Sequence, residues 1–148
     1  MIFQAAHFNR TSLHKIIEIL TPEQLYNIPK GFKNNIIWNM GHILVTEQLL
    51  SYKLSGLELP IHEKFVSLYG KGSLPKKDVS TEDIEEVKTL LNAIKKTEKD
   101  YNNGVFKTYN TYPTSTGIVL KNIEDALQFN TFHEGIHLGI ILSIKKLV

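Results

Sequence analysis

Residues 122–148 read NIEDALQFNTFHEGIHLGIILSIKKLV, and this stretch decides the expected fold. Asn122 is a residue type that caps helix N-termini well, so we predict a helix from this position to residue 148. The apolar side chains recur at intervals of three and four, as they do on the buried face of a helix, at Ile123, Ala126, Leu127, Ile140, Ile141, Ile144 and Leu147.

Polar residues interrupt this apolar face in the middle of the predicted helix. The spacing requires core residues at positions 130, 133 and 137, where the chain has Asn130, His133 and His137. Buried polar groups cost about 1–3 kcal/mol each unless they have partners. His133 and His137 are four residues apart, so they share one helix face at about 40°. Residues 133–137 (HEGIH) match the H-E-x-x-H pattern, in which two imidazoles bind one metal ion.

A second predicted helix, from about residue 34 to residue 55, is apolar on most of its surface. Asn34 or Asn35 can cap its start, and Gly56 is placed to end it. A helix that is apolar on most sides is largely buried in a folded domain. We therefore expect this helix to pack in the centre of the fold.

His42 lies on this second helix and supplies the third ligand of the predicted site. It shares a face with Trp38 and Val45 and follows Gly41, a small residue that allows close approach of a neighbouring helix. Catalytic metal sites typically combine three protein ligands with an open position for water or substrate. We predict a divalent metal site formed by His42, His133 and His137.

The remaining periodic segments complete an all-α four-helix bundle. The first helix is expected over Ile2–Leu20, followed by a short helical turn that begins at Thr21. A long connection over Leu57–Ser80 holds a short helix near residues 62–69, and Ser80 then opens a helix that extends to about Tyr101. Val105-Phe106 and Ile118-Val119 are strand-like and predict a short hairpin.

Composition excludes several classes of protein. The 148 residues, 42% hydrophobic, are expected to form one domain over residues 1–148. The net charge is only +2 and basic residues cluster only in pairs, so no nucleic-acid partner is expected. The chain has no cysteine, which leaves His, Asp and Glu as metal ligands. It shows neither a secretory leader nor an apolar stretch of about 18 residues, so we expect a cytoplasmic protein without membrane insertion.

H-E-x-x-H also occurs in zinc proteases, but that interpretation is disfavoured. The third protease ligand lies downstream of the motif, and only eleven residues follow His137, none of them His, Glu or Asp. Glu134 lies about 100° around the helix from His133. We therefore expect Glu134 to be either a weak candidate for proton transfer or a surface carboxylate.

Three further histidines are not expected to bind the ion. His7 and His14 lie seven positions apart on the first helix, where capping or surface roles are expected, and His62 lies in the long connection and is expected to be solvated.

Two motifs resemble the DinB-like (DinB/YfiT) family of metalloenzymes: residues 37–43 (IWNMGHI) and residues 133–139 (HEGIHLG). The family's three metal histidines fall on His42, His133 and His137. The resemblance implies a bundle with a long crossover between its second and third helices, and it implies homodimers. Relatives include thiol-S-transferases, thiol-dependent isomerases and an iron-binding domain of sulfoxide synthases. The family often has Gln where this chain has Ile140, which weakens the transfer of any particular activity.

These observations predict a metal-dependent enzyme that acts on a small molecule. Zn²⁺ is the first choice of metal, with Ni²⁺, Fe²⁺ and Mn²⁺ as alternatives, and the cosubstrate is a low-molecular-weight thiol or, for hydrolase-like chemistry, water. We expect Trp38 to line an apolar cleft at the site and the Tyr109–Ser115 loop to cover it. The competing hypothesis is a non-catalytic protein, either a bundle in which the metal only ties two helices together or a small-molecule-binding module of a stress response.

Overall fold

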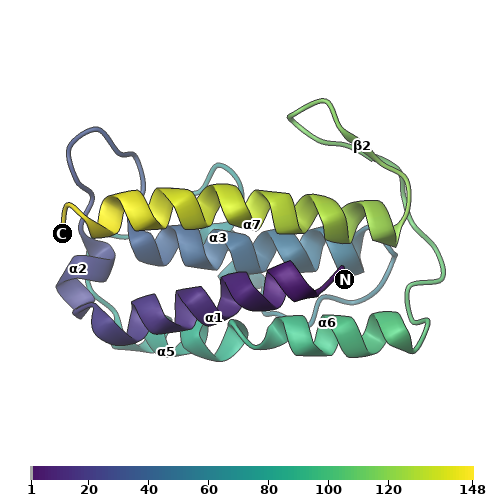
Figure 1. Cartoon of the computed structure of the whole chain (residues 1–148), viewed down its shortest axis with the longest axis horizontal. Coiled ribbons are helices and arrows are strands. Elements are labelled where there is room, and N and C mark those ends of the chain that lie inside the picture. Colours follow the sequence, from purple (N-terminus) through teal and green to yellow (C-terminus); the bar gives the residue numbers. More distant parts are fainter. Residues whose placement is uncertain (1) are drawn as a thin grey trace.

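The computed structural model describes residues 2–148 and shows a bundle of four helical rods that lie side by side along the long axis (Figure 1). These rods are α1 (Gln4–Ile19), α3 (Ile36–Gln48) continued by the π-helix η1 (Leu49–Lys53), α5 (Thr81–Leu90) followed by α6 (Ala93–Asn102), and α7 (Ile123–Lys145). The predicted all-α bundle is confirmed. The short helices α2 (Pro22–Tyr26) and α4 (Glu63–Tyr69) lie in the connections.

The second rod is the buried centre of the bundle, as its composition predicted. Every residue of α3 except Thr46 is buried. Asn35 caps this helix by accepting a hydrogen bond from the backbone N–H of Trp38. The side-chain amide of Asn35 also donates to the carbonyl oxygens of Tyr26 and Lys76, which fixes the helix start against both neighbouring connections. Beyond η1, Gly56 adopts a φ of 73° and turns the chain away, as predicted.

The third rod differs from its prediction because it is two helices rather than one. Helix α5 begins after Ser80, whose side chain accepts from the N–H of Asp83, but it ends at Leu90, and α6 begins at Ala93. Asn92, a poor helix former, lies at the break. The break lets α5 bury Val87 in the larger core cluster while α6 buries Ile94 in a second cluster near the start of α7.

The predicted hairpin exists, but its first strand lies elsewhere. Strand β1 (Tyr112–Pro113) pairs antiparallel with β2 (Val119–Leu120), with Tyr112 opposite Leu120. Residues 105–106 form no strand, because Phe106 packs its ring against Tyr52 of η1 at 5.1 Å. The segment before β1 is fastened to η1 and to the two residues that follow it by hydrogen bonds to the carbonyl oxygens of Leu50, Leu54 and Ser55. The hairpin is therefore held above α7 (Figure 1).

The long crossover between the second and third rods carries α4, as predicted for residues 62–69. Phe65 and Tyr69 of α4 are buried in the larger core cluster. Within residues 2–148, no helix combines the length and the apolar character needed to cross a membrane.

Candidate metal centre

The three predicted ligands meet between α3 and α7. One ring nitrogen from each of His42, His133 and His137 lies within 4.8 Å of the other two. The ring centroids are 4.5 Å apart for His133 and His137, 4.9 Å for His42 and His137, and 5.2 Å for His42 and His133. Helix α7 places His133 and His137 on one face because they are four residues apart, and the packing of α3 against α7 brings His42 opposite them.

Hydrogen bonds fix two of the three rings. The Nδ1–H of His42 donates to the carbonyl oxygen of Tyr69 at 2.8 Å, and the Nδ1–H of His137 donates to Oδ1 of Asn39 at 2.8 Å. Each bond keeps the proton on Nδ1, so Nε2 keeps a free lone pair. Metal-binding histidines commonly use their second nitrogen in this way. Asn39 is itself held, because its amide donates to the carbonyl oxygen of Asn35 at 2.7 Å.

Trp38 packs against the face of the His42 ring. The two rings stack with centroids 4.8 Å apart and an interplanar angle of 8°. The indole Nε1–H of Trp38 donates to Oγ of Ser73 at 2.9 Å, which anchors the indole to the crossover. Trp38 therefore holds the His42 ring in place, rather than lining the cleft as expected.

Gly41 lets the Tyr69 ring pack directly on α3. A Cβ at position 41 would lie 2.3 Å from the nearest carbon of that ring, so no larger residue fits without movement. The same tyrosine supplies the carbonyl oxygen that orients His42. Gly41, which precedes His42, thus allows the contact that positions the His42 ring.

Burial favours the neutral form of the three histidines of the cluster. Burial, with a smaller effect of the neighbouring imidazoles, lowers the pKa of His133 to about 3. Burial and the nearby His42 lower the pKa of His137 to about 4. Burial also lowers the pKa of His42, with the ammonium of Lys71 acting in the same direction and the hydrogen bond to Tyr69 acting against it.

The donor set fits a divalent metal ion. Neutral imidazole nitrogens are good ligands for Zn²⁺ and for its neighbours in the first transition row. Within the described chain, Nδ1 of His133 is buried and has no hydrogen-bond partner. Three lone-pair donors that converge in a partly buried space repel one another, and a bound divalent ion would replace this repulsion by attraction.

Glu134, the acidic residue of the H-E-x-x-H motif, does not face the three histidines. Its side chain is completely buried, so the expectation of a surface carboxylate is wrong. The carboxylate accepts from Arg10 at 2.6 Å and 3.3 Å and from the amide of Asn130 at 2.7 Å. Arg10 also donates to Glu47 at 2.7 Å, which joins α1, α3 and α7. Glu134 is therefore a structural residue, and the proton-transfer role considered for it is not supported.

The other histidines lie outside the cluster. Nε2 of His7 donates to Oε2 of Glu98 at 2.6 Å near the surface. His62 is exposed, as predicted, and caps α4 by accepting from the N–H of Lys64. His14 is half-buried, and its Nε2 has no partner among residues 2–148.

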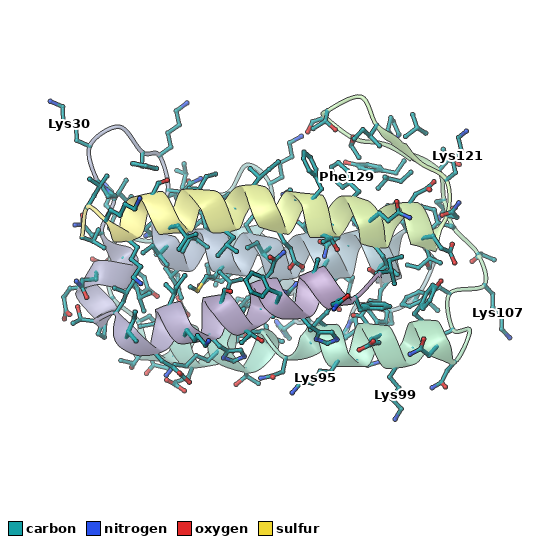
Figure 2. All side chains as sticks on the ribbon, viewed as in Figure 1. Lys30, Lys95, Lys99, Lys107, Lys121 and Phe129 are labelled. Atoms are coloured by element: carbon teal, nitrogen blue, oxygen red, sulfur yellow. The ribbon has the colours of Figure 1, made fainter. Side chains whose placement is uncertain are left out.

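A cleft of about 350 Å³ opens beside His42 and His133. Its walls are mainly aliphatic and aromatic side chains of α3, η1 and α7. The hairpin closes one side with Tyr112, Thr114 and Ser115, so part of the Tyr109–Ser115 loop covers the cleft as predicted. Phe129 points from α7 toward the hairpin and lines the same space (Figure 2).

The fold and the site together define a helical-bundle protein whose second and last rods contribute three converging histidines. A family model described as the DinB superfamily matches residues 5–141, so the chain belongs to the DinB superfamily. No curated protein matches the sequence. Ile140, where the resemblance led us to expect Gln, is partly buried and packs against the larger core cluster.

Proposed function

We propose that this protein is a metal-dependent enzyme that binds one divalent ion through His42, His133 and His137 and acts on a small molecule in the adjoining cleft. The convergence of three ring nitrogens within 4.8 Å carries the proposal. The cleft at the cluster favours an enzyme over a bundle in which the metal only joins two helices, because a purely structural ion needs no such space.

Zn²⁺ is the ion that we propose first, with Ni²⁺, Fe²⁺ and Mn²⁺ as alternatives. A bound divalent ion lowers the pKa of a thiol or water that coordinates it, which provides a nucleophile at neutral pH. Three protein ligands leave room for such a fourth ligand. The protein's own contribution is to hold the imidazoles, through Asn39 and the Tyr69 carbonyl, in the orientation that binding requires.

The reaction that we propose is thiol-S-transfer, with hydrolysis as the version that uses water. The thiol sulfur forms a bond to an electrophilic carbon, the bond from that carbon to its leaving group breaks, and the thiol proton passes to solvent. The apolar walls of the cleft, among them Val45 and Leu49, would hold the electrophile and exclude water from the reacting carbon.

Metal content tests the first half of the proposal. We expect elemental analysis of the purified wild type to find close to one divalent ion per chain, and His133→Ala to retain much less. His62→Asn is the matched control, because it removes an exposed imidazole while keeping a residue that caps α4. Equal metal content in the wild type and in His133→Ala would refute the site.

An activity assay tests the second half. The metal-loaded protein is incubated with a panel of low-molecular-weight thiols and chlorodinitrobenzene, and release of chloride is followed. We expect turnover that disappears on chelation and returns when the ion is restored. A fully metallated protein that leaves every thiol, aryl halide and ester substrate unchanged would favour the non-catalytic bundle or small-molecule-binding module.

A further inference from the structure

The cleft extends from the histidines toward the far end of η1. On the second rod its wall consists of one helical face, formed by His42, Val45, Thr46, Leu49, Leu50 and Lys53. Lys53 lies eleven positions after His42, which corresponds to roughly 16 Å along an α-helix axis. On α7 the wall runs in the opposite direction, from Ile136 and His133 at one end to Phe129 at the other. The cleft is therefore elongated, with the histidines at one end and Lys53 at the other.

The charged side chains that line this cleft are all positive. Lys53 and Lys71 are the charged residues among the described lining residues, and no carboxylate lines the space. Neither lysine makes an ion pair anywhere in residues 2–148, whereas Lys76 and Lys96 elsewhere on the surface pair with aspartates. Lys53 and Lys71 come from different elements, η1 and the crossover after α4. Two exposed lysines that line a mainly apolar space without a carboxylate favour a ligand with negative charge.

We propose that the cleft selects a small amphipathic anion, with Lys53 binding the anionic group and the apolar part of the molecule lying along the wall toward the histidines. As a statement about the enzyme's substrate class, this inference rests on the proposed function. The charge preference itself depends on Lys53 and can be measured without metal. The volume of about 350 Å³ is at the small end of ligand pockets, so the ligand is a compact molecule.

The two parts of such a ligand match the two parts of the wall. Val45, Leu49 and Phe129 offer apolar surface along the middle of the cleft, where a hydrocarbon or aromatic portion would be removed from water. Lys53 is exposed, so its aliphatic stem can cover the wall while the ammonium stays hydrated at the end. Neutral ligands would bind through the apolar wall alone, and cations would be repelled by both lysines.

Matched eight-carbon probes test the charge preference. The affinities of octanoate, 1-octanol and octylammonium are measured by calorimetry at pH 7 on metal-free protein. We expect octanoate to bind about fivefold more tightly than octanol, as for a partly exposed ion pair, and octylammonium to bind most weakly. The preference for octanoate should shrink as salt is raised. Equal affinity for octanoate and octanol in the wild type would overturn the proposal.

Single substitutions assign the preference to a residue. Lys53→Gln should remove most of the difference between octanoate and octanol affinity while octanol affinity stays unchanged, because only Lys71 then remains. Lys107→Gln, which makes the same charge change at an exposed lysine that points away from the bundle (Figure 2), should leave all three affinities unchanged. Loss of the preference in Lys71→Gln but not in Lys53→Gln would overturn the role given to Lys53.

Repeating the titrations with zinc-loaded protein separates this inference from the proposed function. A protein that binds no zinc yet prefers octanoate would refute the metalloenzyme and leave the anion preference standing. A protein that binds zinc but shows no preference for octanoate when it is metal-free would refute the anion preference and leave the metal site standing. A preference that appears only with zinc would mean that the carboxylate binds the ion, and it would overturn the assignment to Lys53.

Discussion

Helix α7 carries two polar clusters next to each other, and they are satisfied in different ways. Glu134 is enclosed with Arg10 and Glu47 in the core, where the exposed fractions are 0%, 2% and 0%. His133, the preceding residue, faces two other imidazoles across a half-buried space. The first cluster holds opposite charges that pair within the chain. The second holds lone-pair donors with no cation of their own.

This difference separates a structural polar group from one that binds something. Burying a carboxylate is tolerated when an arginine and hydrogen-bond donors surround it, and Glu134 has both. The imidazoles of His42 and His137 are oriented by acceptors on their outer nitrogens, which leaves the inner nitrogens directed into the cluster. Three converging donors, two of them oriented by hydrogen bonds, form a group that could hold a cation from outside the chain.

The largest predicted effect concerns the buried charged cluster of Arg10, Glu47 and Glu134. Arg10→Ala leaves Glu47 and Glu134 buried without their cation, so we expect the free energy of unfolding to fall by about 3–5 kcal/mol, as it does when one partner of a buried pair is removed. Urea denaturation of metal-free protein measures this change. Lys95→Ala, at an exposed lysine of α6, is the control and should change stability by less than about 0.5 kcal/mol.

A triple substitution tests whether unpaired charge causes this loss of stability. Arg10→Met combined with Glu47→Leu and Glu134→Met removes all three charges at similar volume, and we expect it to recover most of the lost stability. Metal binding should persist in the triple variant, because none of these residues touches the histidine rings. If the triple variant were as unstable as Arg10→Ala, unpaired charge would not be the whole cost, and the buried donors of Asn130 and Thr97 that lose their acceptors would account for the rest.

The next effect tests the packing beneath the histidine cluster. Gly41→Ala places a methyl group against the Tyr69 ring, and we expect a destabilisation of about 1–3 kcal/mol together with weaker metal binding, because the Tyr69 carbonyl orients His42. Gly139→Ala, on α7, has no atom within 4 Å of the added Cβ. It should stabilise the helix by about 0.5–1 kcal/mol. Denaturation and zinc titration of both variants distinguish a local clash from a general effect of alanine.

A smaller effect is expected from the acceptor that orients His137. Asn39→Leu removes Oδ1, and we expect zinc affinity to fall by about 10- to 100-fold, the usual cost of losing such a partner. Asn39→Asp keeps an acceptor for the Nδ1–H and should retain most of the affinity. Competition with a chromophoric chelator measures both. Equal losses in the two variants would mean that position 39 acts through the fold and not through this hydrogen bond.

Sequence periodicity predicted the rods and the convergence of the three histidines, because both depend on local spacing. The interval between His133 and His137 places them on one face, and the apolar surroundings of His42 place it inside the bundle. The same reasoning missed the break at Asn92, because two separate core clusters, and not local spacing, decide where the third rod divides.

Partners that come from distant positions were also missed. The Glu134 side chain is buried because it pairs with Arg10, which lies 124 positions earlier in the chain. Arg10 does carry a signal, since it lies on the apolar face of the first helix with Ala6, Leu13 and Ile17. A charged residue on such a face requires a buried counterpart. The Tyr69 carbonyl carries no comparable signal, because any residue supplies a backbone acceptor.

Acid should affect the two clusters with opposite sign, and this last effect is the smallest. The unfolded chain binds protons on histidine near pH 6.5, whereas the folded pKa values are about 3 for His133 and about 4 for His137, because of burial. As the pH falls from 6.5 toward 5, the unfolded state gains protons that the folded state does not, so metal-free protein loses stability. Burial, opposed by Arg10, raises the pKa of Glu47, so protonation there acts in the opposite direction.

A comparison of the wild type with a His133 variant isolates the contribution of this histidine to the pH dependence of stability. His133→Asn removes one of these groups, so the loss of stability between pH 6.5 and pH 5 should be smaller in the variant than in the wild type. The difference for one histidine is at most about 1.4 kcal/mol per pH unit, and the partial exposure of His133 reduces it further. Denaturant titrations in chelator at several pH values measure it. If stability fell equally with pH in the two proteins, His133 would titrate alike in the folded and unfolded states. The contrast between the charged cluster around Glu134 and the neutral histidine cluster would then fail.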